Sequence, residues 1–587
     1  MPKFSIDGKE YDARPGQTII QVAQEHGIDI PHFCWHPALT VAGNCRMCLV
    51  EIEKNPKLQI ACATPVTEGM VVKTLSDAAT KGREDVMEFL LINHPLDCPI
   101  CDEAGQCKLQ DYAFEHSRGE SRFTEEKTHK DKRVPFGPNV LFDGERCISC
   151  SRCIRFSEEV AEQPVLSFVH RGDHVTIAAD PAEGFDNSLS MNVIDICPVG
   201  ALTSRDFRFK ARVWDMSFTD SVCPGCSRGC NIRVGVRNNE VLRTEPRTNP
   251  NVNGYWMCDE GRLESYPPVN EARIDGPRMK DAHGGAWQPT NYEAAARRTA
   301  EALKKYHKDE VLLLGSARMP IEDNYALVKL AKEKFGKRAV PFILHIEGQD
   351  EMKLVRADKT PNAMGATLVG GVADGHYQHL HGEGEAKKTV LELLRSGKIK
   401  AVFSIAGNFL ADAELMAAME HVEFFATCAT NDNVTTRRAD VVFSTSQWAE
   451  REGVYVNFEG WVQHLRPAVT TKHHIRGIDH LNMSRLDRFG TNFDKWAQGT
   501  KRDARENWRH IQMIANELGA HWHYLHTEDL FEEIAGTLPE FKGMTYATLG
   551  HLGQPIATKH AEVVQPQYRE SYQTSTERID NIGSVVL

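Results

Sequence analysis

The sequence predicts a chain of several domains, of mixed α+β and α/β class, with metal-binding domains in its front half. The first observation is length, because 587 residues amount to about four domains at roughly 150 residues each. The second is the distribution of cysteine, since fifteen of the sixteen cysteines lie between Cys34 and Cys258. The third is the alternation of strand-like and helix-like stretches after residue 290. A single compact core is therefore excluded.

Composition and charge exclude several classes of protein. A hydrophobic content of 41% and a charged content of 26% are ordinary for a globular chain, which excludes disorder. Acidic residues outnumber basic ones by 81 to 69 and no block of basic residues stands out, so no nucleic acid is expected as a partner. The sequence opens without a targeting segment and has no long apolar run, which predicts a cytoplasmic chain that meets a membrane only through partner subunits. Thiols in that compartment favour metal ligation over disulfides.

The first cysteine motif follows a predicted hairpin and helix. Asp7-Gly8 suits a tight hairpin turn, and a helix is expected between Thr18, as its cap, and Gly27, as its stop. The motif C-x10-C-x2-C-x13-C then consists of Cys34, Cys45, Cys48 and Cys62. Four thiolates on a long loop and a hairpin can enclose a two-iron cluster, and the segment resembles the β-grasp 2Fe-2S ferredoxin domain. The alternative is a structural zinc site, although zinc ribbons usually pair two C-x2-C turns.

The second motif follows a predicted helix over residues 83–92. It has the spacing H-x3-C-x2-C-x5-C and consists of His94, Cys98, Cys101 and Cys107. Three thiolates leave one iron of a four-iron cubane without a ligand, and a neutral imidazole can fill that position. Two alternatives remain: a zinc site with the same ligands, or a cubane with water on the fourth iron and His94 merely nearby.

Two further motifs lie between residues 147 and 258. One is C-x2-C-x2-C with a distant Cys-Pro, made of Cys147, Cys150, Cys153 and Cys197, and this pattern wraps a cubane. The other is C-x2-C-x3-C-x27-C, made of Cys223, Cys226, Cys230 and Cys258. A predicted hairpin with its turn at Asn238-Asn239 would bring Cys258 back to the other three. This fourth motif could hold zinc or a cubane, and the presence of three other motifs typical of iron-sulfur clusters favours the cubane.

In this order the four motifs resemble the G-subunit family of bacterial NADH:quinone oxidoreductases, the enzymes of respiratory complex I. The resemblance is tight over residues 1–265. It implies one 2Fe-2S cluster and three 4Fe-4S clusters on the sixteen ligands named above, with the fourth site off the main route of electrons. It also implies that the chain conducts electrons and has no catalytic residues or other cofactor site of its own.

The back half resembles the molybdopterin oxidoreductase superfamily. Val311–Gly315 is predicted as a strand and is followed by an amphipathic helix, and a second α/β unit is expected at Ala401–Gly407. A pattern similar to a superfamily signature near the pterin-binding region consists of Ala439–Phe443, Glu450, Glu452, Gly453, Asn457, Glu459, Gly460 and Gln463. No motif is recognisable after about residue 470.

The expected domains follow from these motifs. They are a β-grasp 2Fe-2S ferredoxin-like domain at 1–80, a cubane domain with one histidine and three cysteine ligands at 81–120, a ferredoxin-like cubane domain at 121–215, a cubane domain of molybdopterin-oxidoreductase type at 216–272, and a molybdopterin-oxidoreductase-like α/β domain with a C-terminal tail at 273–587.

The resemblance also implies the partners and the location. Electrons from NADH would enter a flavin on a neighbouring subunit, pass through this chain and leave toward a quinone-facing cluster subunit, coupled in the whole complex to proton translocation. NADH should bind elsewhere, since the nearest glycine pattern, Gly382–Lys387, lacks the third glycine of a dinucleotide site. The expected location is the cytoplasmic side of the bacterial inner membrane, in peripheral association.

The rival class is a catalytic molybdenum enzyme, such as an NAD-linked formate dehydrogenase. Such an enzyme needs a thiolate or selenolate on the metal, and Cys428 is the one cysteine outside the four motifs. It lies in an apolar strand-like run, Phe424–Ala429, where a buried small hydrophobe is the simpler interpretation. No molybdenum is therefore expected. An iron-iron hydrogenase would need further cysteines in the back half, where the sequence has none besides Cys428.

Overall fold

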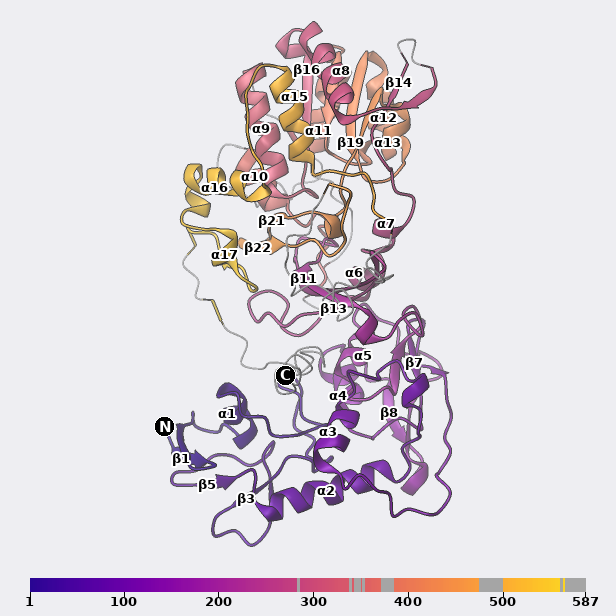
Figure 1. Ribbon diagram of the computed structural model, residues 1–587, viewed down its shortest axis with the longest axis vertical. Coiled ribbons are helices and arrows are strands. Elements are labelled where there is room, and N and C mark those ends of the chain that lie inside the picture. Colours follow the sequence, from indigo (N-terminus) through magenta and orange to yellow (C-terminus); the bar gives the residue numbers. More distant parts are fainter. Residues whose placement is uncertain are drawn as a thin grey trace, which may run out of the picture. The chain divides into compact units, whose positions relative to one another are not determined.

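In the computed structural model the chain folds into two compact units, whose helices and strands are labelled in Figure 1. The first unit comprises Met1–Met216 and the second Ser217–Val564. The structure describes residues 1–281, 285–336, 340–342, 350, 354–370, 385–473, 500–559 and 563–564. Gly382 and Gly384 of the glycine pattern therefore lie outside the described residues. None of the helices within these ranges is long and apolar enough to cross a bilayer.

The first unit opens with a five-stranded sheet in the order β2-β1-β5-β3-β4. Its elements are β1 (Lys3–Ile6), β2 (Lys9–Asp12), α1 (Ile19–Glu25), β3 (Leu49–Ile52), β4 (Gln59–Ile60) and β5 (Val71–Lys73). The predicted hairpin is confirmed, because Asp7 and Gly8 both have positive φ and join β1 to β2. The predicted first helix is confirmed as well, with Thr18 as its N-cap and Gly27 just after its end.

The rest of the first unit consists of the 15-residue helix α2 and of shorter helices and strands joined by loops. These are α2 (Asp77–Leu91), η1 (Cys98–Ile100), α3 (Lys108–His116), β6 (Val134–Pro135), β7 (Val140–Phe142), α4 (Arg152–Glu159), β8 (Leu166–Val169), η2 (Gly172–His174), β9 (Thr176–Ala179), α5 (Asn192–Ile196), β10 (Leu202–Ser204) and η3 (Val213–Asp215). The helix expected from residue 83 begins earlier, because the Ser76 hydroxyl caps it by accepting from the Ala79 amide at 3.2 Å.

The second unit opens with the antiparallel sheet β11-β12-β13. Its strands are β11 (Ser217–Val222), β12 (Asn231–Arg237) and β13 (Glu240–Pro246), followed by α6 (Asp259–Leu263) and α7 (Pro267–Asn270). The predicted turn is confirmed, since Asn238 and Asn239 both have positive φ between β12 and β13.

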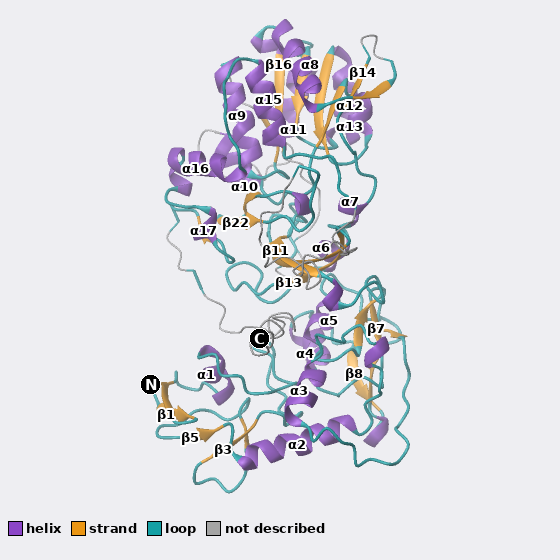
Figure 2. Ribbon diagram, in the orientation of Figure 1, coloured by secondary structure: helices purple, strands orange, loops and turns teal. Residues whose placement is uncertain are grey.

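A seven-stranded sheet in the order β15-β14-β20-β19-β18-β16-β17 forms the centre of the second unit, and its parallel strands run between helices in Figure 2. The elements are β14 (Arg278–Lys280), β15 (Trp287–Pro289), α8 (Tyr292–Lys305), η4 (Lys308–Glu310), β16 (Val311–Ser316), α9 (Ile321–Phe335), β17 (Val340–Phe342), α10 (Ala363–Gly370), α11 (Glu385–Arg395), β18 (Ala401–Ser404), η6 (Phe409–Ala411), α12 (Ala413–Ala418), η7 (Met419–His421), β19 (Phe424–Ala429), α13 (Val434–Arg438) and β20 (Val441–Ser444). The strand and helix expected near residues 311–335 and the strand at 401 are thus confirmed.

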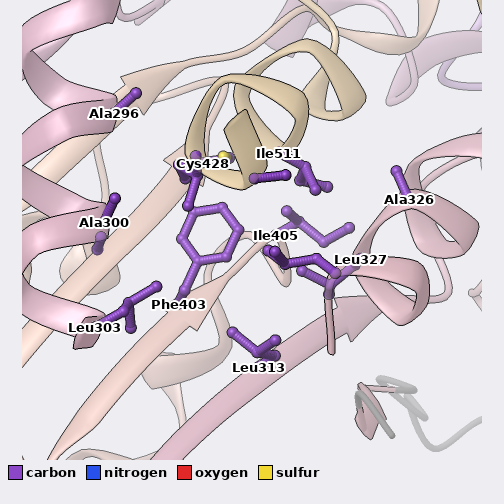
Figure 3. Close-up of a cluster of buried hydrophobic side chains, with 14 of the residues drawn as sticks. Ala296, Ala300, Leu303, Leu313, Ala326, Leu327, Phe403, Ile405, Cys428 and Ile511 are labelled. Carbon is purple, nitrogen blue, oxygen red and sulfur yellow. The ribbon is translucent and has the colours of Figure 1, made fainter. Parts of the chain in front are cut away.

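Alternate residues of each parallel strand face opposite layers of helices. Leu313 of β16 packs with residues of α8, α9 and α15 (Asn507–Glu517), while Leu312 packs with residues of α11 and α12. Cys428 lies in the first of these layers, among Phe403 and Ile511 (Figure 3), and is only 1% exposed. The expectation that Cys428 acts as a buried small hydrophobe is confirmed.

The stretch without a recognisable motif completes the second unit. Besides α15 it supplies α16 (Thr527–Thr537), η10 (Pro539–Phe541), α17 (Tyr546–Leu549) and β23 (Gln554–Pro555). β23 pairs with β22 (Trp461–Leu465), which pairs with β21 (Gly453–Val456), in a small three-stranded sheet, and η8 (Trp448–Glu450) precedes β21. Trp508 of α15 is buried against the large sheet's core. These residues therefore belong to the folded α/β region.

Two adjacent carboxyl groups are buried at the start of α9. Glu322 accepts hydrogen bonds from the Val454 amide at 3.0 Å and from the Tyr546 hydroxyl at 2.8 Å. Burial raises the pKa of Glu322 to about 8. Its neighbour Asp323 is paired with Arg451 at 3.2 Å. Glu322 is therefore neutral in the folded chain at pH values where an exposed glutamate is charged.

We expect Glu322→Gln to flatten the pH dependence of the stability of the second unit. Because the folded-state pKa lies above the unfolded value, the folded state holds an extra proton between pH 4.5 and 8, and the free energy of unfolding falls as pH rises through this window. A glutamine stays neutral and removes this contribution. Unfolding free energies at pH 5.5 and pH 8.5 should differ less in Glu322→Gln than in the parent chain. Glu532→Gln, at an exposed site on α16, is the control, and equal slopes in all three proteins would refute the assignment.

Candidate metal centres

The four cysteines of the first motif meet beneath the β3-β4 hairpin. Cys48 precedes β3 and Cys62 follows β4, and the Ala61 amide donates to the Cys48 carbonyl at 2.9 Å. The Cys34 amide donates to the sulfur of Cys45 at 3.4 Å. Hydrogen bonds from the thiols of Cys45 and Cys62 lower the pKa of Cys34, which means that three of the sulfurs are in contact. Cys62 also hydrogen bonds to Cys48, so the four sulfurs form one group.

The second motif surrounds the start of α3. Cys101 and Cys107 are buried, whereas Cys98 is exposed. Burial raises the pKa of both buried thiols, and the charges of Cys98 on Cys101 and of Cys101 on Cys107 add to this rise, so the three sulfurs are neighbours. Gly105 makes the turn between them with a φ of 90°.

His94 and Cys101 lie near the same positive charge, because the Arg146 guanidinium acts on both of them. Burial, followed by the charges of Lys127 and Arg146, lowers the pKa of His94 to about 4. The imidazole is therefore neutral near pH 7, which is the form that binds metal. This is the one histidine that the sequence singles out as a ligand.

The third motif lines a cavity. Cys147, Cys150, Cys153 and Cys197 share its wall with apolar side chains that include Phe142, Ile177 and Leu202. The three closely spaced cysteines lie at the start of α4, where Ser149 and Ser151 adopt positive φ, and Cys197 ends α5. The Ser149 amide donates to the sulfur of Cys147 at 3.4 Å. Burial raises the pKa of all four thiols, so they need a cationic centre to become thiolates.

The fourth motif lies at the end of the β11-β12 hairpin. The Cys223 amide donates to the Cys230 carbonyl at 2.8 Å, and backbone amides donate to the sulfurs of Cys223 and Cys258 at 3.4 and 3.3 Å. A Cβ atom on Gly261 would lie 3.1 Å from the Cys223 sulfur and 3.2 Å from the Cys258 sulfur. All four cysteines are buried, and Cys258 caps α6. The β12-β13 hairpin lies between Cys230 and Cys258 and returns Cys258 to the other three cysteines, as expected.

Residues of the superfamily signature hold the loop of the fourth motif. The Asn457 amide group donates to the Arg228 carbonyl at 3.1 Å, and the Gln463 amide group donates to the Gly229 carbonyl at 2.9 Å. Gln463 also accepts a hydrogen bond from Asn231. The sequence associates this signature with pterin binding, whereas in the structure these two members contact the loop between Cys226 and Cys230.

The donor set of the third motif fits a cluster of iron and sulfide. Within the described ranges, no three histidine, cysteine, aspartate or glutamate side chains converge tightly enough to hold one metal ion directly. A four-iron cluster is larger than an ion and needs thiolates spaced around a cavity, with amides directed at sulfur. The third motif has both features, a common cavity and an amide on Cys147.

Three of the four sites adjoin one another within the first unit. Arg155 donates to the carbonyls of Cys34 and Cys150, which belong to the first and third motifs. The sulfur of Cys107 lies 3.9 Å from the carbonyl oxygen of Pro198, next to Cys197. The third site therefore touches both the first and the second.

Arg152 and Arg155 were not singled out by the sequence. Both side chains are buried on α4 and both donate to the backbone around cysteines. The sequence does contain a signal, because two basic residues stand inside and just after a motif that is predicted to hold a negatively charged cluster. Arginine is common on surfaces, however, and the sequence alone does not distinguish the two locations.

Five known families match parts of the chain. The matching families are the 2Fe-2S iron-sulfur cluster binding domain at residues 2–77, the NADH-ubiquinone oxidoreductase-G iron-sulfur binding region at 83–122, the ferredoxin-like domain of NADH-quinone oxidoreductase subunit 3 at 137–203, the molybdopterin oxidoreductase Fe4S4 domain at 216–264 and molybdopterin oxidoreductase at 366–477. The chain therefore contains both 2Fe-2S and 4Fe-4S binding domains.

Curated relatives match half of the chain or somewhat more. The G subunit of NADH-quinone oxidoreductase from Rickettsia conorii is 41% identical over 334 residues, which are 57% of this chain and 49% of that protein. The corresponding G subunit from Streptomyces coelicolor is 39% identical over 356 residues, covering 60% and 42%. The NADH-ubiquinone oxidoreductase 75 kDa subunit of Reclinomonas americana is 44% identical over 296 residues, covering 50% and 42%. The aligned part thus spans about half the length of these relatives.

The matched families and the curated relatives agree on the same kind of protein. The part of the chain that these relatives cover is homologous to the G subunits of NADH-quinone oxidoreductases.

Proposed function

We propose that the chain is an iron–sulfur electron-transfer subunit of an NADH:quinone oxidoreductase. It takes electrons from the flavin of a neighbouring NADH-binding subunit and passes them toward a quinone-facing cluster subunit, and the whole complex couples this transfer to proton translocation. The observation that carries the proposal is the adjacency of the first three motifs through Arg155 and Pro198. Sites that adjoin through the backbone provide the short gaps that electron transfer requires.

The ligand sets of the proposal are those predicted by spacing. A 2Fe-2S cluster is held by Cys34, Cys45, Cys48 and Cys62, and cubanes are held by His94 with Cys98, Cys101 and Cys107, by Cys147, Cys150, Cys153 and Cys197, and by Cys223, Cys226, Cys230 and Cys258. The fourth site lies in the second unit and serves no proposed step of the main route. The five expected segments, with boundaries after residues 80, 120, 215 and 272, are the domains of this arrangement. The complex is peripheral on the cytoplasmic side of the bacterial inner membrane.

We expect the full chain, purified without oxygen, to contain about fourteen iron atoms and matching acid-labile sulfide. Cys150→Ser should lose iron and Cys428→Ser should not, because only the first is a proposed ligand. Stoichiometric zinc with little sulfide would overturn the proposal. Stoichiometric molybdenum, with formate oxidation that Cys428→Ser abolishes, would instead favour the molybdenum enzyme.

Replacement of His94 tests the ligand for which the chemistry is most specific. We expect His94→Cys to keep a cubane and to lower its reduction potential, because a thiolate adds a negative charge to the ligand shell and disfavours the reduced cluster. His94→Ala should leave one iron exposed and prone to loss. Paramagnetic resonance during stepwise reduction measures both effects, with His129→Cys at an exposed site as the control. If all cluster signals and potentials stay unchanged in the His94 variants, His94 is not a ligand.

A further inference from the structure

Two buried arginines on α4 lie where the first and third motifs meet. Arg152 is 5% exposed and Arg155 is 8% exposed, although arginine is rarely buried to this extent in proteins. Arg152 stands between Cys150 and Cys153, and Arg155 follows one turn later on the same helix. A buried guanidinium is costly unless its donors are satisfied and its charge is compensated, so the surroundings of both are informative.

Arg155 joins the backbone of the two motifs. One terminal nitrogen, Nη2, donates to the carbonyl of Cys34 and, at 3.4 Å, to that of Cys150. The other, Nη1, donates to the carbonyl of Thr40, and Nε donates to the Ser151 hydroxyl at 3.2 Å. The planar guanidinium group of Arg155 thus fixes the loop after Cys34 against the loop before α4.

Arg152 makes a second, parallel connection. Its Nη2 donates to the carbonyl of Trp35 at 2.5 Å and its Nη1 donates to the carbonyl of Ile196 at 2.9 Å. Trp35 follows Cys34 and Ile196 precedes Cys197, so this side chain also connects the two motifs. Asn44 adds a bond at the rim by donating to the Ser149 carbonyl at 3.1 Å.

The positive charges lie within electrostatic reach of ligand sulfurs of both motifs. Arg152 and Arg155 both act on Cys150, and Arg155 also interacts with Cys34. The hydrogen bonds named above all end on neutral oxygens, so they satisfy donors without neutralising charge. Thiolate-bound clusters are anionic and gain a further negative charge on reduction. Two such clusters side by side repel each other, most strongly in a medium of low dielectric constant.

We propose that Arg152 and Arg155 form a cationic bridge between the site of Cys34, Cys45, Cys48 and Cys62 and the site of Cys147, Cys150, Cys153 and Cys197. The bridge holds the two loops in register and raises the reduction potentials of both clusters by stabilising their reduced states. Because the positive charges offset the repulsion between the clusters, an electron on one cluster has only a small effect on the energy of reducing the other. This inference rests on the proposed function, since it requires clusters at both sites.

The test is to measure the potentials of the full chain during stepwise reduction with dithionite, followed by paramagnetic resonance. Arg155→Gln should shift the potentials of the two-iron cluster and of the Cys147 cubane in the negative direction together. Arg152→Gln should shift that cubane in the same direction. Arg155→Lys keeps the positive charge but loses the several hydrogen bonds of the guanidinium group. In this variant the reduction potentials of the two clusters should stay close to those of the parent chain, while the magnetic interaction between the clusters weakens.

The controls separate the possible failures. Arg171→Gln, at an exposed position, and the signal of the cubane held by Cys223, in the second unit, should remain unchanged. Unchanged potentials in Arg155→Gln and Arg152→Gln, with full iron content, would overturn the bridge and leave the proposed function intact. If Arg155→Gln loses iron, the potential of the Cys147 cubane in Arg152→Gln decides between the outcomes, because Arg155 still holds the two loops together in that variant. A parent chain without iron and sulfide would overturn the proposed function itself.

Discussion

Gly200→Ala should abolish the cubane at Cys101 and leave about four iron atoms fewer per chain. A Cβ atom at this position would lie 2.1 Å from the Cys101 sulfur and 3.0 Å from the Cβ of Glu103, far inside contact distance. The neighbouring backbone is fixed because the Lys108 amide donates to the Pro198 carbonyl at 3.1 Å. The alanine therefore either displaces the ligand or distorts the loop after Cys197.

Iron and sulfide analysis, with the paramagnetic signals of the separate clusters, measures this effect. Overpacking should also lower the free energy of unfolding by about 1–3 kcal/mol. The matched control is Gly536→Ala, because Gly536 lies in the helix α16 with no atom within 4 Å of the added Cβ. That change should keep all iron and stabilise the helix by about 0.5–1 kcal/mol. A Gly200→Ala chain with full iron and unaltered signals would contradict the close approach of Cys101.

The second large effect is expected for Arg273→Ala, which should lower the free energy of unfolding of the second unit by about 3–5 kcal/mol. Arg273 is paired with Glu450 at 2.7 Å, and the two side chains are 0% and 1% exposed. Arg273 also donates to the carbonyls of Val269, Thr430 and Thr445. Its removal leaves a buried carboxylate and three carbonyls without this donor.

Denaturant unfolding of the full chain, followed by a probe of the second unit, measures the loss. Arg297→Ala is the control, because Arg297 and Glu517 form an exposed pair 3.9 Å apart and should contribute at most about 1 kcal/mol. Adding Glu450→Gln to Arg273→Ala should restore part of the stability by removing the stranded charge. Equal stability of the Arg273 and Arg297 variants would show that the buried pair contributes little.

Local features of this chain could be predicted from the sequence because their causes are local. The turn at Asn238-Asn239 and the helix capped by Thr18 follow from the conformations that these residues favour within a few positions. The cysteine spacings are equally local for three ligands of each cubane motif. The start of α2 lies six residues before the predicted one, because Ser76 is a cap only if the chain after β5 turns at that point.

Contacts between distant segments could not be predicted in this way. Asn457 and Gln463 stand in a signature that suggested a pterin, yet they contact a loop more than two hundred residues earlier. The burial of Arg152 and Arg155 depends on a loop more than one hundred residues away in the sequence. Sequence periodicity carries no information about such pairs, since it reports only which face of one element is apolar.

The contact between Gln463 and Gly229 also sets an order of events during synthesis. The two residues are 234 positions apart, so a ribosome adding about 5–20 residues per second exposes Gln463 some 10–50 s after the loop that it holds. The ligands in the first unit, by contrast, have all been translated before Cys223 is made. Each nascent chain therefore passes through an interval in which its first three motifs are complete while the fourth still lacks its support.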